Sequence, residues 1–147
     1  MLHLDQSVPV DPRFPLSGPE LMEIFEGLAQ VFGLEHWEIS LRIVDDQEMA
    51  ELNHTFMGCL GPTNVLSFPG NDENWLGDLV LSTDTLARES YLYNQDTHEY
   101  TVRLLAHGLL HLMGHDHGPD MEALTELAVD TVRLDPDASV RRLFPSV

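Results

Sequence analysis

The chain has 147 residues, 43% of them hydrophobic and 22% charged, so it can bury one core of ordinary size and is not disordered throughout. Its 25 acidic residues outnumber seven basic ones, which are all Arg, and the formal net charge is −18. This balance argues against an ordinary nucleic-acid-binding protein, whose affinity comes mainly from Lys and Arg on phosphates. An RNA or DNA function would need a local positive group, for which a metal ion is one candidate.

The first part of the chain predicts two strands and two helices. The expected elements are a short strand at 2–4, a helix at 17–33, a half-buried strand at 37–43 and a short polar helix at 46–53. Ser17 and Glu20 have the spacing of a capping box at the start of the first helix.

The second part predicts two more strands and three helices after a loop at 54–62. The expected elements are strands at 65–68 and 77–82 and helices at 83–93, 97–113 and 119–134. Apolar residues surround most of the 97–113 helix, which should therefore be central and buried. The fold class is α/β (α+β): a small mixed sheet of about four strands with about five helices, as a single domain over 1–147.

Three features bear on location. The sequence has no run of about 18 apolar residues, so we expect no membrane span. The N-terminal residues lack the basic and apolar regions of a secretory signal. Cys59 is the only cysteine and cannot form an internal disulfide, which suits a reducing cytoplasm.

Four of the eight histidines fall within residues 107–117. His107 and His111 are four residues apart, so on a helix their rings project from the same face and can reach one metal ion. Gly114 allows the chain to turn back and bring His115 or His117 to the same point. Three imidazoles with one open position are typical of a catalytic zinc site. The spacing alone does not decide between His115 and His117.

Two other interpretations of the histidines are open. Histidines on an apolar helix can be core residues that bond to the backbone. A structural zinc site is the second alternative, and it would need a fourth ligand such as Cys59, although a single cysteine is more often a small buried hydrophobe.

Gly108 stands where the usual zinc proteases have their glutamate base, which weakens a proteolytic interpretation. The glycine leaves space either for a bulky substrate or for a neighbouring strand. Asp116 can orient a histidine ligand or accept a proton from a bound water, or else cap the turn. Asp116 and His115 are the catalytic candidates.

The segment HGLLHLMGHDH at His107–His117 resembles the H-G-x-L-H-L-x-G-[YH]-D-H pattern of the YbeY family of zinc-dependent endoribonucleases. Leu52-Asn53, PTNVLSFP at Pro62–Pro69 and GDLVLS at Gly77–Ser82 resemble further segments of that family. The similarity covers roughly residues 52–117.

This resemblance implies zinc bound by His107, His111 and His117, and it favours His117 over His115 because the family often has Tyr at the latter position. Nickel or another divalent ion is an expected substitute in vitro. The implied activity is cytoplasmic cleavage of single-stranded RNA in 16S rRNA 3′-end processing and ribosome quality control. The implied partners are ribosomal RNA and the small ribosomal subunit with its proteins or GTPases; we expect no membrane and no DNA partner.

Two positive groups of the family pattern are missing. Met57 stands where many members have Arg, and Gly61 replaces a Lys. Arg88 and Arg103 in the flanking helices are candidate replacements, the alternative for each being a solvated surface residue. Ser67 and Phe68 are expected to offer a strand edge to substrate.

The missing charges keep two alternative functions open. One is a zinc hydrolase of another ester or amide, and the other is a ribosome-associated factor with weakened catalysis.

Overall fold

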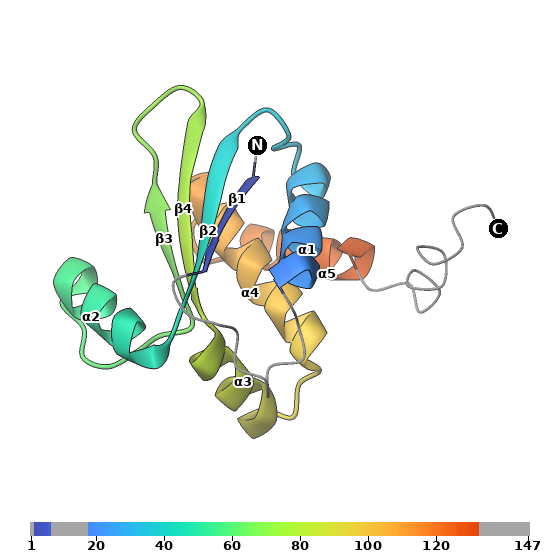
Figure 1. Cartoon of the computed structure of the whole chain (residues 1–147). Helices are drawn as coiled ribbons and strands as arrows, with labels where there is room; N and C mark the ends of the chain where they lie inside the picture. The colour runs from blue at the N-terminus through green and yellow to red at the C-terminus, as the bar shows by residue number, and fades with distance from the viewer. Residues whose placement is uncertain (1, 7–17, 133–147) are drawn as a thin grey trace.

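The structure is a computed structural model that describes residues 2–6 and 18–132 (Figure 1). Their elements, in chain order, are β1 (Leu2–Gln6), α1 (Gly18–Val31), β2 (Glu38–Val44), α2 (Asp46–Met57), β3 (Val65–Pro69), β4 (Trp75–Ser82), α3 (Thr83–Leu92), α4 (Thr97–Leu112) and α5 (Pro119–Val132). The predicted fold class, a mixed sheet of four strands with five helices, is confirmed.

The four strands form one sheet in the order β1-β2-β4-β3. β1 and β4 run parallel to β2, while β3 runs antiparallel to β4, with Ser67 opposite Leu79. Within the described part of the chain, β3 pairs with β4 alone, and its other edge has no strand beside it. The edge strand of the sheet is therefore β3, which contains Ser67 and Phe68, the two residues expected to contact substrate.

Helices cover both faces of the sheet, but unequally (Figure 1). Residues of α1, α4 and α5 pack with Leu79 and Leu81 of β4 into the larger core. Val80, the residue between these two leucines, points to the other face and packs with Met49 of α2 and Leu66 of β3 in a smaller cluster. This division follows from the alternation of side chains along a strand.

α4 is the central helix that its sequence predicts, with nine of its residues buried. α2 is longer than expected: it continues past Asn53 to Met57 and ends at Gly58, whose φ of 65° is in the left-handed region. The predicted cap at Ser17 lies outside the described residues. None of the helices in residues 18–132 combines the length and apolar character that a membrane crossing needs.

Candidate metal centre

The C-terminal end of α4 gathers three histidines. His107 and His111 lie one turn apart on the helix, and the chain then turns at Gly114, where φ is 93°. The amides of Gly114 and His115 donate to the carbonyl oxygens of His111 and Leu110, at 3.0 Å each. These two bonds make a Schellman motif, which closes the helix and redirects the chain.

This turn brings His117, and not His115, to the first two histidines. One ring nitrogen from each of His107, His111 and His117 lies within 4.8 Å of the others. The ring centroid of His117 lies 5.0 Å from that of His107 and 4.9 Å from that of His111. Within the described residues, these three side chains form the only group of His, Cys, Asp or Glu with such spacing.

A backbone contact fixes the orientation of the His111 ring. Its Nδ1 lies 3.1 Å from the carbonyl oxygen of His115, which can only accept, so Nδ1 carries the proton and donates. In the neutral ring this leaves the lone pair on the other nitrogen, Nε2, which lies 3.1 Å from Nε2 of His107. Metal-binding histidines commonly have this second hydrogen bond.

The donor set fits a divalent metal ion. Two nitrogens on one tetrahedral zinc ion, at about 2.0–2.1 Å each, are about 3.3–3.4 Å apart, close to the separation of the His107 and His111 Nε2 atoms. Burial, followed by the charges of His111 and His117, lowers the pKa of His107. A lowered pKa favours the neutral imidazole that binds metal.

Three other candidates from the sequence lie outside this group of nitrogens. His115 contributes its backbone carbonyl to His111. The carboxylate of Asp116 is exposed and has no hydrogen bond within the described part of the chain. Cys59 is exposed in the loop after α2, where its thiol lies 3.5 Å from the carbonyl oxygen of Met57, and no described residue joins the three histidines as the fourth ligand of a structural zinc site.

Gly108 is where α4 meets the edge strand. A Cβ atom at this position would lie 2.9 Å from Cδ2 of Leu79 and 3.3 Å from Oγ of Ser67. Ser67 donates to the carbonyl oxygen of Gly108 at 3.1 Å. The glycine thus makes room for the neighbouring strands rather than for a bulky ligand, and it places β3 next to His107.

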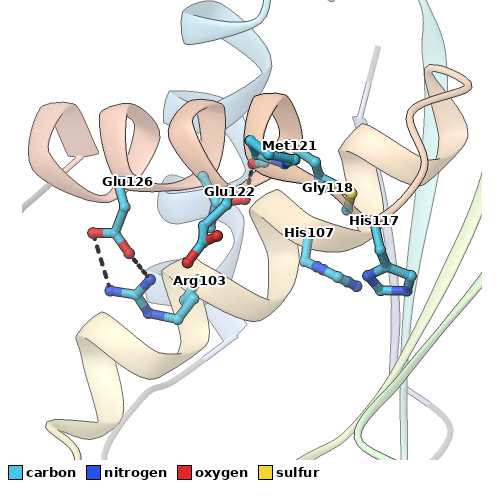
Figure 2. Close-up of a pocket in the computed structure, with 9 residues that line it drawn as sticks. Arg103, His107, His117, Gly118, Met121, Glu122 and Glu126 are labelled. Carbon is cyan, nitrogen blue, oxygen red and sulfur yellow. Dashed lines mark hydrogen bonds and ion pairs between the residues drawn. The ribbon is translucent and has the colours of Figure 1, made fainter.

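A cavity of about 470 Å³ opens beside the histidines, between α4 and α5 (Figure 2). Its lining includes His107, His117, Arg103, Glu122 and Glu126. Arg103 forms an ion pair with Glu126, and this hydrogen bond raises the pKa of Arg103 and lowers that of Glu126. In Figure 2, Glu122 lies between this ion pair and the two histidines.

Arg88, the other candidate for phosphate binding, is in a different place. Its guanidinium donates to Asp46 at 2.9 Å and so joins α3 to α2. It does not line the cavity beside His107.

Sequence reasoning missed the carboxylates of α5. Glu122 and Glu126 are four residues apart on a predicted helix, which places them on one face. Nothing in the sequence indicates that this face turns toward α4. That fact depends on how the two helices pack.

Similarity to known proteins extends over most of the chain. Residues 19–130 match a family model described as Endoribonuclease YbeY. A protein of that name from Nitratidesulfovibrio vulgaris is 42% identical over 137 aligned positions, covering 79% of this chain and 85% of the relative. Another, from Oleidesulfovibrio alaskensis, is 40% identical over 137 positions, covering 77% and 81%.

A solved structure gives the same fold. The solution structure of TM1509 from Thermotoga maritima superposes with a TM-score of 0.67 over 97% of this chain and 93% of that one, at 22% identity. At that identity the similarity speaks for the fold alone. The family match covers most of the chain, and the sequence relatives are similar over most of their own length. The chain therefore belongs to the endoribonuclease YbeY family.

Proposed function

We propose that this protein is a zinc-dependent endoribonuclease that cleaves single-stranded RNA in the cytoplasm during ribosomal RNA maturation. The observation that carries the proposal is the convergence of His107, His111 and His117, in a chain whose relatives are named for endoribonuclease activity. Family membership favours RNA over the other ester or amide substrates that the sequence left open. In this proposal, residues 1–147 form a single metal-dependent hydrolase domain of the YbeY type.

His107, His111 and His117 would hold the metal ion. When bound, it would supply positive charge to the scissile phosphate and lower the pKa of an attacking water. The zinc ion matters especially here because the chain is strongly acidic and has no Lys. The hydrogen bond from Nδ1 of His111 to the His115 carbonyl orients the ring, so that Nε2 is the nitrogen offered to the metal.

The remaining roles belong to residues around the histidines. Arg103 lies one turn before His107 on α4 and lines the same cavity, so we assign it to an RNA phosphate. Ser67 and Phe68 present the free edge of β3 to the RNA. The exposed turn that carries His115 and Asp116 lies directly beside His117, and we assign these two side chains to proton transfer. Arg88 is not included, because it does not line this cavity.

The biological substrate in this proposal is the precursor of 16S rRNA at its 3′ end. The small ribosomal subunit, with its proteins or an associated GTPase, would deliver that substrate. The acidity of the chain supports this, since a protein of charge −18 gains little affinity from RNA phosphates by itself.

The test is cleavage of a labelled single-stranded RNA and of the same sequence as a duplex. Metal-loaded protein should cut only the single strand, and a chelator should abolish the cleavage until zinc is restored. His111→Ala should lose both bound metal and activity. His36→Ala, an exposed histidine in the α1–β2 loop, is the matched control and should keep both. Cleavage that survives in His111→Ala would refute metal catalysis at this site.

A further inference from the structure

An exposed apolar surface lies at the end of α2 and the loop after it. Phe56, Met57 and Leu60 are 61%, 49% and 90% exposed. The ring of Phe56 meets that of Phe68 on β3 edge to face, with centroids 5.2 Å apart and planes at 69°. We call these four side chains the Phe56 surface. Single exposed apolar residues are common, but several within five residues of the chain, one of them in contact with a second aromatic ring, are typical of a binding site.

Two neighbouring residues of β3 link the Phe56 surface to the candidate metal centre. Ser67 points to the α4 face of the sheet and bonds to Gly108, next to His107. Phe68, the next residue, points to the opposite face and packs against the small cluster under α2. Since no described strand covers this edge of β3, an extended chain bound at the histidines can cross the edge and reach Phe56.

The charges of the described residues favour bases over phosphates as the groups recognised here. All three arginines in this part of the chain are engaged by carboxylates: Arg42 by Glu48, Arg88 by Asp46 and Arg103 by Glu126. Stacking of a base on an aromatic ring needs no cation and tolerates any sequence. Phe68 is anchored in a cluster, so it holds Phe56 in place by the edge-to-face contact.

We propose that Phe56, supported by Phe68, stacks an unpaired base of the RNA beside the cleavage position and thereby selects single strands. The inference rests on the proposed endoribonuclease function and adds a specificity residue to it. A base in a duplex is already stacked and paired on both sides, and it cannot present its face to Phe56 without being unstacked.

The test compares three substitutions at this exposed position. Phe56→Ala removes the ring, Phe56→Leu keeps apolar area without an aromatic face, and Phe56→Trp keeps the face. The matched control is Tyr91→Ala on α3, an aromatic side chain that is 86% exposed and away from the metal centre. Bound metal and thermal midpoint are measured for each variant, since neither should change.

For a short single-stranded RNA, Phe56→Ala and Phe56→Leu should raise KM about 5- to 100-fold, the range for loss of one stacked base, with kcat nearly unchanged. Phe56→Trp and Tyr91→Ala should behave as the unaltered protein. A second readout does not need catalysis: RNA containing 2-aminopurine should lose fluorescence on binding chelator-treated protein, and Phe56→Ala should abolish that loss.

Equal KM values for Phe56→Ala and Tyr91→Ala would overturn the inference. Full binding by Phe56→Leu would also overturn it, since apolar area rather than stacking would then suffice. Weaker association with ribosomal proteins at unchanged KM for RNA would assign the surface to a protein partner instead. If the unaltered protein cuts no RNA, the proposed function fails, and the 2-aminopurine signal still decides whether Phe56 stacks a base.

Discussion

Ser67 on the edge strand β3 donates a hydrogen bond to the carbonyl oxygen of Gly108 on α4, at 3.1 Å. This contact joins the helix that carries two of the histidines to the edge strand that we assign to RNA binding. Because Gly108 follows His107 directly, the distance between the edge of the sheet and the histidines is set at this point. The absence of a side chain at Gly108 permits the approach.

Gly108→Ala should destabilise the protein by up to about 2 kcal/mol. The new Cβ would lie 2.9 Å from Leu79 and 3.3 Å from Ser67, and overpacking of a core costs about 1–3 kcal/mol. The higher helix propensity of alanine offsets about 1 kcal/mol of this. Urea unfolding measures the free energy. Gly27→Ala in α1 is the control: its Cβ would meet the tip of Val132 at 3.3 Å, and it should cost less. A stabilised Gly108→Ala protein would contradict this account.

The histidine motif shows what the sequence could reveal and what it could not. The spacing of His107 and His111 was sufficient to predict their common face, because a helix repeats every 3.6 residues. The choice of His117 over His115 rested on resemblance, and the Schellman turn at Gly114 supplies its physical reason. For Gly108, the sequence could not decide between space for a substrate and space for a neighbouring strand. The answer depends on tertiary packing, which places Leu79 and Ser67 against the glycine.

The residues that were missed have the same explanation. Glu126 reaches Arg103 because α5 packs against α4, and no local pattern encodes that contact. The sequence ended α2 at Asn53, which left Phe56 in a loop; in the helix, it meets Phe68. Asp116 was expected to orient a histidine, take a proton or cap the turn. None of these roles is decided by a contact, because its carboxylate has no hydrogen bond to any described residue.

Metal binding should stabilise the folded protein, because unfolding separates the three histidines. Zinc at 100 times its dissociation constant adds about 2.7 kcal/mol to the free energy of unfolding. A thermal melt with and without zinc should therefore show a rise in midpoint that His111→Ala and His117→Ala abolish.

His115→Ala is the informative control for that experiment. Its side chain lies outside the group of ring nitrogens, and only its backbone carbonyl contacts His111. The variant should keep the full zinc-dependent rise in midpoint. Loss of that rise in His115→Ala, with retention in His117→Ala, would reverse the assignment of the third ligand.

Glu126→Gln should strengthen RNA binding. The substitution removes one negative charge from the cavity and loosens the ion pair that engages Arg103. We expect KM for single-stranded RNA to fall severalfold. The slope of log affinity against log salt concentration should steepen by about one, as for one additional phosphate contact. Arg103→Ala should act in the opposite direction, raising KM by about 10-fold or more.

Glu35→Gln makes the same change of charge in the α1–β2 loop and serves as the control for long-range electrostatics. If it lowers KM as much as Glu126→Gln does, net charge rather than Arg103 governs binding. An unchanged KM in both Glu126→Gln and Arg103→Ala would remove Arg103 from the substrate path.

The junction between α2 and α3 should make stability depend on pH in the acid range. Burial raises the pKa of Asp46, but hydrogen bonds from Arg88, Thr85 and Ser82 outweigh burial, so the net pKa is lowered from 3.8. A carboxyl group with a lowered folded-state pKa stabilises the protein above its unfolded pKa, and that contribution is lost as pH falls through the folded value. Asp46→Asn should therefore cost about 1–2 kcal/mol at pH 7.

The difference between the unaltered protein and Asp46→Asn should shrink as the pH falls from about 3.8 through the lowered folded-state pKa of Asp46, since below that pKa both proteins carry an uncharged group at this position. Urea midpoints at pH 7 and pH 3 measure the effect. Asp72→Asn in the exposed β3–β4 turn controls for the loss of one charge and should cost little at either pH. A cost for Asp46→Asn that does not vary with pH would mean that the shape of the side chain, and not its ionised form, holds α2 to α3.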